Sequence, residues 1–107
     1  MIIKQYDIFQ VNLDPAVGHE MKKTRPCVVL SPNEMNSCLE TIIVAPLTSK
    51  YHAYPTRTKV ILNKKTGYIV LDQIKTLDRK RFIKKLGALT FVAIKDVKTI
   101  IKEMMVE

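Results

Sequence analysis

Hydrophobic and polar residues alternate over several short stretches of the chain, and this pattern predicts a mainly β protein. In DIFQVNL, residues 7–13, neighbouring positions fall on opposite faces, which is the period of two that a strand has. Five further stretches have the composition of strands: RPCVVLSP at 25–32, TIIVAPLT at 41–48, KVILN at 59–63, YIVLD at 68–72 and IKKLGAL at 83–89. The short connections between them favour an antiparallel sheet.

The segments between these strands carry turn and loop signals. Residues 14–24 open with Asp-Pro and contain Gly18, which tolerates backbone angles that other residues avoid. Residues 33–40 predict a short helical turn, and KKTG at 64–67 resembles a hairpin connection. Residues 73–82 are expected to form a loop with one helical turn.

After Thr90 the pattern changes to the period of an α-helix. Apolar side chains recur at helical spacing, at Ile94, Val97, Ile100, Ile101, Met104 and Met105. Lys95, Lys98 and Lys102 fall on the other side, and Thr90 suits the N-cap. We therefore expect one domain, residues 1–107, mainly β with α: a small barrel-like antiparallel sheet closed by a C-terminal helix.

Positive charge is unevenly distributed along the sequence. The chain has 18 Lys and Arg against 10 Asp and Glu, a net charge of +8. No acidic residue occurs between Thr41 and Leu71, whereas a basic run falls there: Lys50, Arg57, Lys59, Lys64 and Lys65. A second basic cluster consists of Lys75, Arg79, Lys80, Arg81, Lys84 and Lys85. Such a surface attracts polyanions, nucleic acids above all, although lysines that merely solvate a face give the same composition.

Composition also narrows the class of protein. The apolar runs fall well short of the roughly 20 residues of a membrane span, and the first residues, MIIKQYD, do not resemble a signal peptide. A cytoplasmic location is therefore expected. Cys27 and Cys38 form no CxxC pair and complete no zinc-site spacing, so we expect two reduced, structural thiols.

VGHEMKKTRPCVVLSP, residues 17–32, concentrates titratable side chains directly before a predicted strand. Arg25 stands at the start of that strand, where its guanidinium can bind a phosphate through two parallel hydrogen bonds. Glu20 lies on the same loop and could hold Arg25 by an ion pair. Thr48 and Ser49 end another strong strand, with Lys50 next, and their hydroxyls can donate to a phosphate oxygen. The alternatives are an ordinary charged hairpin and an ordinary strand end.

Two histidines and two tyrosines lie in polar loops. His19 and His52 suggest general acid–base catalysis by a pair of histidines, although loop histidines are often idle. Tyr51 and Tyr54, together with His52, could stack on unpaired bases or simply cover a small core.

The turn LDQIKT places Asp72, Gln73 and Lys75 close together, and these groups can read base edges or cap the turn. The sequence has no glycine-rich phosphate loop and no carboxylate cluster for magnesium ions. Phosphodiester cleavage here would therefore run without metal, which RNA permits because its own 2′-OH is a nucleophile.

Four segments, in this order and spacing, resemble the MazF/PemK family of toxins, the ribosome-independent endoribonucleases of toxin–antitoxin pairs. They are YDIFQVNLDPAVGHE at 6–20, RPCVVLSPNEMN at 25–36, VAPLTSK at 44–50 and LDQIKTLDRKR at 71–81. The likeness covers essentially the whole chain.

The resemblance implies an SH3-like β-barrel with a C-terminal helix and an active homodimer whose interface helps to build an RNA groove. It implies metal-independent, sequence-specific cleavage of single-stranded RNA, leaving a 2′,3′-cyclic phosphate and a 5′-OH, with no cofactor. It also implies a cognate antitoxin that lays an extended acidic C-terminal segment across the same groove.

The resemblance assigns roles to individual residues. Arg25 stabilises the transition-state charge and can shuttle a proton, and Thr48 hydrogen-bonds the scissile phosphate. Glu20 matches the family's loop acid, and His19 matches a histidine that some members use. The residues expected to bind substrate are Lys22, Lys23, Thr24, Ser49, Lys50, Asp72, Gln73 and Lys75.

The chain departs from the family pattern at two places. The loop between Glu20 and Arg25 is commonly rich in glycine and glutamine, whereas here it reads MKKT. Some members carry a catalytic arginine two residues before the Asp of the DQ motif, and here that position is Val70. The catalytic role that the resemblance implies therefore rests on Arg25 and Thr48.

Two other functions fit the same resemblance or the same charge. One is a gyrase-targeting toxin of this fold, whose action resides in a C-terminal helix with a Trp-containing tail; this chain has no Trp and ends EMMVE. The other is a non-catalytic nucleic-acid-binding barrel. Only the ribonuclease cuts labelled RNA into discrete fragments in the presence of EDTA.

Overall fold

The computed structural model describes residues 1–51 and 54–106. In these residues the elements are β1 (Asp7–Asn12), β2 (Thr24–Val29), α1 (Asn33–Cys38), β3 (Thr41–Thr48), β4 (Arg57–Leu62), β5 (Lys65–Val70), η1 (Leu71–Gln73), β6 (Lys75–Asp78), η2 (Arg79–Arg81), β7 (Phe82–Ala88) and α2 (Phe91–Met105), where η denotes a 3₁₀ helix. The expected class, mainly β with a C-terminal helix, is confirmed.

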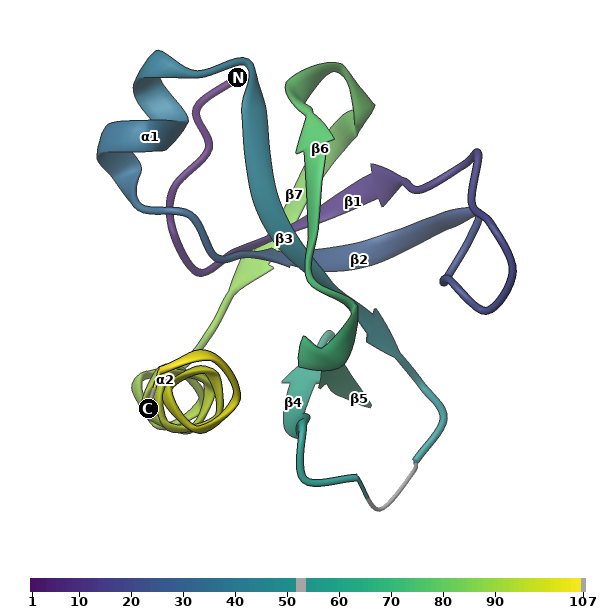
Figure 1. Ribbon diagram of the computed structural model, residues 1–107, viewed down its shortest axis with the longest axis vertical. Coiled ribbons are helices and arrows are strands. Elements are labelled where there is room, and N and C mark those ends of the chain that lie inside the picture. Colours follow the sequence, from purple (N-terminus) through teal and green to yellow (C-terminus); the bar gives the residue numbers. More distant parts are fainter. Residues whose placement is uncertain (52–53, 107) are drawn as a thin grey trace.

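The central strand of the sheet is β3 (Figure 1). The strands follow the order β4-β5-β3-β2-β1-β7, and β6 pairs separately with β3. Thr41–Val44 of β3 pair with β6, whereas Leu47 and Thr48 pair with β5. Because β3 changes partners along its length, the antiparallel sheet curls, and β3 leads from the barrel-like part of the sheet into the β4–β5 hairpin.

Hydrophobic side chains cover both faces of this sheet, in two clusters. Ile8 and Val28 belong to a cluster that includes the buried side of α2, whereas Phe9, Val11 and Val29 belong to a cluster inside the curled sheet. Neighbours on one strand thus point into different clusters, as the period of two predicts. The ring of Phe9 meets Phe82 edge-on, with centroids 5.5 Å apart.

The C-terminal helix begins where the sequence predicts. The Thr90 hydroxyl accepts a hydrogen bond from the Ala93 amide at 3.2 Å, which is the expected N-cap. Ala93, Val97 and Ile100 are buried against the sheet. The last part of the predicted apolar stripe, Met104 and Met105, is exposed. In Figure 1, α2 is seen along its axis, and the β1–β2 loop lies on the far side of the molecule from it.

The β4–β5 hairpin turns one step earlier than the sequence suggested. Asn63 and Lys64 both adopt positive φ, 52° and 65°, so they form the turn, and Gly67 lies inside β5. Asparagine tolerates this left-handed backbone better than most residues, so a two-residue turn forms without glycine.

Strand β6 was not expected, because residues 73–82 were assigned to a loop. Its four residues pair with β3 alone, from Thr41↔Asp78 to Val44↔Lys75. A strand this short has too few positions to establish a period, so only its partner reveals it. No helix among the described residues is long and apolar enough to cross a membrane.

Candidate active site

Arg25 lies near the start of β2 with its guanidinium anchored at one end. Its Nε donates to the backbone oxygen of Lys22 at 3.2 Å. No hydrogen bond or ion pair within residues 1–51 and 54–106 occupies its two terminal amino groups. The fork of the guanidinium is therefore oriented by the protein and open to an external oxyanion.

The expected ion pair between Glu20 and Arg25 does not form. One carboxylate oxygen of Glu20 accepts from the Val17 amide at 2.8 Å, and the other lies 3.5 Å from the Lys75 ammonium. The Val17 amide, and then the Lys75 charge, lower the pKa of Glu20. The loop folds back on itself at this point, so Glu20 faces Lys75 and leaves Arg25 without a carboxylate.

Thr48 is the last residue of β3 and lines the same pocket as Arg25. The pairing of β2 with β3, Cys27↔Pro46, Val28↔Ala45 and Val29↔Val44, ends two residues short of both. The Thr48 oxygen accepts from the Lys50 amide at 3.2 Å, so its hydrogen remains free to donate.

A pocket of about 360 Å³ opens at this pair, within the range of roughly 300–1,000 Å³ typical of ligand sites. Arg25, Thr48 and Ser49 line it together with three polar residues of the β4–β5 hairpin, Asn63, Lys65 and Thr66. Its other lining residues are Pro26, Leu47, Leu62, Gly67 and Leu86. The hairpin contributions were not predicted: Lys65 stood only in the general basic run, and nothing in the sequence singles out Asn63.

Gln73 and Lys75, two of the residues expected to bind substrate, contact the β1–β2 loop in this structure. The Gln73 amide oxygen accepts from the Met21 amide at 2.8 Å, and its nitrogen lies 3.5 Å from the backbone oxygen of His19. The Lys75 ammonium donates to the Met21 oxygen at 3.4 Å in addition to its pair with Glu20. His19 itself is exposed, and its described contact is through its backbone.

The other lysines that were expected to bind substrate are exposed. Lys22 and Lys23 project from the loop, and Lys50 follows β3; none of the three takes part in a described side-chain ion pair. Thr24 begins β2 opposite Asn12 and is exposed. Lys23 has a φ of 68°, and its amide donates to the Asp14 carboxylate at 2.9 Å, which fixes the base of the loop.

Asp72 is not at the Arg25 pocket. Its carboxylate accepts from Arg57 Nε at 3.1 Å and from the Thr56 hydroxyl at 2.9 Å. Partial burial would raise the pKa of Asp72, but the hydrogen bonds from Arg57 and Thr56 outweigh it and the pKa is lowered. Arg57 pairs across the hairpin with Val70. Some family members carry an arginine at the position of Val70, and in this chain Arg57 faces that position from the neighbouring strand. Only the register of the hairpin reveals this arrangement.

Tyr51 and Tyr54, which were expected in a polar loop, each contact another side chain of the protein. Tyr51 meets the ring of Tyr68 edge-on, with centroids 5.2 Å apart and 61° between planes. Tyr54 lies under the Arg57 guanidinium, 5.1 Å from ring centroid to carbon. The sequence had not marked Tyr68. His52 lies outside the described residues.

Both cysteines are free thiols, as expected: Cys27 is fully buried and Cys38 is exposed. Burial raises the pKa of Cys27 to about 12, although Lys75 and Arg25 both act in the opposite direction. Among the described residues, no three His, Cys, Asp or Glu side chains gather as a metal-binding group would require.

Comparison with solved structures finds the same fold. MazF from Deinococcus radiodurans superposes with a TM-score of 0.88 at 23% identity, over 98% of this chain and 97% of that one. Its complex MazE–MazF gives 0.82 at 23% identity, over 98% and 96%. An endoribonuclease in complex with its cognate antitoxin, from a mycobacterial species, gives 0.80 at 20% identity, over 94% and 92%.

Sequence comparison goes further than these structural likenesses, which at such identities establish the fold alone. Residues 4–105, nearly the whole chain, match one family of toxins. The match confirms the resemblance indicated by the four sequence motifs. The chain belongs to the PemK-like, MazF-like toxins of type II toxin–antitoxin systems.

Proposed function

We propose that this protein is a sequence-specific endoribonuclease that cleaves single-stranded RNA in the cytoplasm without a metal ion. The observation that carries the proposal is that Arg25 and Thr48 line one pocket together with Lys65, and that the exposed Lys22, Lys23 and Lys50 lie within three residues of them in the sequence. A preorganised cation and a hydroxyl donor, fixed on adjacent strands, suit a phosphate whose negative charge grows in the transition state.

In the proposed reaction the 2′-oxygen of the RNA attacks the adjacent phosphorus. A bond from O2′ to phosphorus forms, and the bond from phosphorus to O5′ breaks. The 2′-hydroxyl loses its proton, and the leaving 5′-oxygen gains one. The products are a 2′,3′-cyclic phosphate and a 5′-hydroxyl, and no water is consumed in this step.

Arg25 and Thr48 divide the work at the phosphate. The free amino groups of Arg25 neutralise the charge that develops on the phosphate oxygens, and the Thr48 hydroxyl donates one further hydrogen bond. Two proton transfers are open: a ring nitrogen of His19, exposed on the loop that carries Glu20, takes up the 2′-proton and passes it to the leaving 5′-oxygen, or Arg25 gives a proton to the leaving 5′-oxygen and takes up the 2′-proton in its place. The rate of the variant His19→Ala distinguishes these two assignments.

Digestion of an end-labelled RNA tests the proposal. Wild-type protein should produce discrete fragments with cyclic phosphate ends in excess EDTA, and Arg25→Ala should not. Cleavage that disappears in EDTA and returns with magnesium would contradict the mechanism. Intact RNA under all conditions would favour the gyrase-directed or merely RNA-binding alternatives.

We also propose that the active form is a homodimer. Apolar side chains remain exposed on α2 in the isolated chain, at Phe91, Val92, Met104 and Met105. A second copy is a common way to cover such a surface. Sedimentation equilibrium at micromolar concentration should give the dimer mass. A fully active monomer would show that activity does not depend on the dimer interface.

The proposed inhibitor is a cognate antitoxin with an extended acidic C-terminal segment. Lys65 lines the Arg25 pocket, and the exposed Lys22, Lys23 and Lys50 lie close to Arg25 and Thr48 in the sequence, so that an acidic peptide can use the same positive charges as a phosphate backbone. The complexes of related toxins with antitoxins support this partner. Antitoxin and RNA should then compete, and an antitoxin that blocks cleavage while RNA stays bound at full affinity would contradict a shared groove.

A further inference from the structure

A row of side chains runs from Thr48 across two further strands. Thr48 pairs with Tyr68 on β5, and Tyr68 pairs with Lys59 on β4. Residues directly opposite one another in antiparallel strands point to the same face of the sheet. Thr48, Tyr68 and Lys59 therefore form one row on one face, in that order, and Arg25 shares a pocket with Thr48 at its start.

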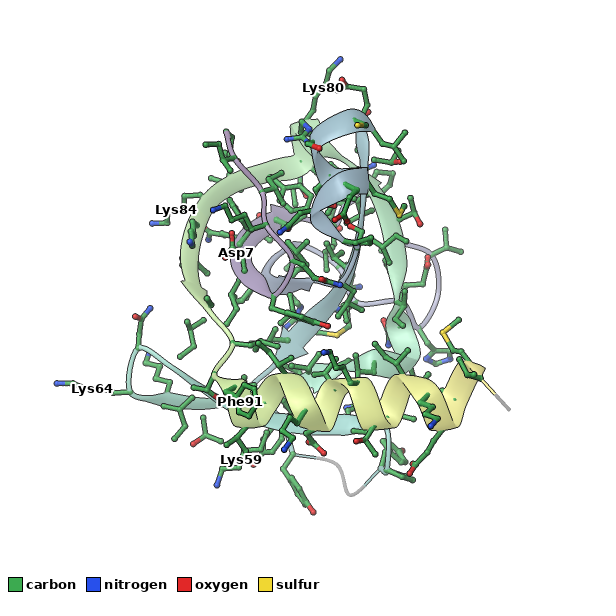
Figure 2. The ribbon with its side chains drawn as sticks, turned by 90° about the vertical axis from the view of Figure 1, so that its left-hand side faces the viewer. Asp7, Lys59, Lys64, Lys80, Lys84 and Phe91 are labelled. Carbon is green, nitrogen blue, oxygen red and sulfur yellow. The ribbon has the colours of Figure 1, made fainter. Side chains whose placement is uncertain are left out.

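This face is the one that α2 leaves uncovered. The alternate residues of the same strands, Leu47, Val60 and Ile69, are buried in the cluster that α2 completes. Because side chains alternate along a strand, Tyr68 and Lys59 must point to the other side. Figure 2 shows Lys59 projecting away from α2, and its side chain is exposed.

The row has the chemistry of a path for a single nucleic acid strand. The Tyr68 ring is partly exposed and makes a T-shaped contact with the ring of Tyr51. On one side of it lies the phosphate site proposed at Arg25 and Thr48. On the other lies Lys59, which takes part in no described ion pair. A flat ring between two anion-binding groups matches the alternation of base and phosphate along a strand.

We propose that Tyr68 is a stacking platform for one unpaired base next to the scissile phosphate, and that Lys59 binds the phosphate beyond that base. The inference rests on the proposed ribonuclease function and names the groups that hold the strand on one side of the cut. An acidic peptide satisfies Lys59 equally well but makes no use of a partly exposed aromatic face, so the ring favours RNA as the occupant.

The test compares two single-stranded DNA oligonucleotides of equal length and charge, one with all its bases and one abasic throughout. DNA has no 2′-hydroxyl, so binding is measured without cleavage. Wild-type protein should bind the base-containing strand more tightly, and binding should quench tyrosine fluorescence, which the chain's lack of Trp leaves unobscured. Tyr68→Ala should lose roughly 5- to 150-fold in affinity for the base-containing strand and nothing for the abasic one.

Four further variants control for fold and charge. Tyr68→Phe should keep the affinity, and Tyr68→Leu should lose it while preserving an apolar side chain, which guards against an unfolded alanine variant. Lys59→Gln should weaken binding of both strands and reduce the slope of log affinity against log salt by about 0.7. Lys98→Gln, a matched exposed lysine on α2, should leave both unchanged.

The outcomes separate this inference from the proposed function. If wild-type protein cleaves RNA in EDTA but Tyr68→Leu binds both oligonucleotides normally, the platform is wrong and the ribonuclease stands. If the base-dependent loss appears and RNA stays intact, the platform stands and the ribonuclease falls. If Tyr68→Leu weakens an acidic peptide while leaving base-containing DNA unaffected, the row is a peptide site and the platform is wrong.

Discussion

Gln73 holds Met21 from 52 residues farther along the chain, with 2.8 Å between its amide oxygen and the Met21 amide nitrogen. Lys75 adds a bond to the Met21 oxygen and an ion pair with Glu20. The conformation of the β1–β2 loop therefore depends on η1 and β6 as well as on its own sequence. Gln73 and Lys75, both expected to bind substrate, thus position the segment that leads to Arg25.

Gln73→Ala should loosen this loop. The variant removes the partner of the Met21 amide, and a typical hydrogen bond contributes about 0.5–1.5 kcal/mol, so the open loop should become roughly 2- to 12-fold more populated. Trypsin, which cleaves after Lys22 or Lys23, should cut the native variant faster by that factor. Thr76→Ala, an exposed neighbour on β6, is the control. Equal rates for Gln73→Ala and wild type would show that the contact does not hold the loop.

Arg25→Ala should lower the rate of single-turnover RNA cleavage by about 100- to 1000-fold, because it removes the preorganised charge at the phosphate. Arg25→Lys should recover little of this loss, since an ammonium cannot reproduce the planar fork anchored on Lys22. Circular dichroism should show both variants folded. A folded Arg25→Ala variant that cuts at nearly the wild-type rate would show that Arg25 has no catalytic role and that the loop is only a charged hairpin.

Thr48→Ala should slow cleavage by less than Arg25→Ala does. It removes one neutral donor to a charged phosphate, an interaction of about 1.5–3 kcal/mol, or roughly 10- to 150-fold in rate. Thr48→Ser keeps the hydroxyl and should retain most activity. If the serine variant is as slow as the alanine variant, the methyl group, through packing at the end of β3, matters more than the hydroxyl.

Periodicity was sufficient to predict most of the fold, because it depends on neighbours in sequence. The alternation of Ile8 and Phe9 and the helical spacing of Val97 and Ile100 each record which side faces a core. Strand β6 escaped prediction because its four residues are too few to show a period. The hairpin turn was misplaced because Asn63 and Lys64 replaced the glycine that usually marks such turns.

The site was predictable only as separate residues. Arg25 and Thr48 could be named from motifs, but only the fold brings them to one pocket. The partner of Asp72, Arg57, belongs to another strand and has no sequence signal that links the two. Residue type alone does not choose between two tasks that one side chain can perform: the amide of Gln73 can bond a base edge or a backbone, and in this structure it bonds the backbone.

The two cysteines should differ sharply in reactivity. At pH 8, an aromatic disulfide reagent should titrate one thiol per native chain, Cys38, because Cys27 is fully buried and burial raises its pKa to about 12. Both should react in guanidinium chloride. Cys38→Ser should therefore leave no fast-reacting thiol in the native protein. Two fast thiols in native wild type would mean that the cluster around Cys27 opens readily.

Asp72 should stabilise the protein in a way that disappears in acid. Hydrogen bonds from Arg57 and Thr56 overcome the effect of burial and lower its folded pKa, whereas the unfolded value is about 3.9. A lowered folded pKa gives a contribution that is fully present above the unfolded value and is lost as the pH falls through the folded one. Because the Asp72 side chain is 39% exposed, the contribution should be modest in size.

Thermal melting of wild type and Asp72→Asn from pH 7 down to pH 2 checks this expectation. The difference in Tm should be constant from pH 7 to about pH 5, shrink below about pH 4, and vanish once Asp72 is protonated in both states. Asp96→Asn, which changes an exposed carboxylate on α2 with no described ion pair, should give a small difference throughout. A gap for Asp72→Asn that widens as the pH falls would reverse the sign of the linkage and rule out the Arg57–Asp72 contact as its source.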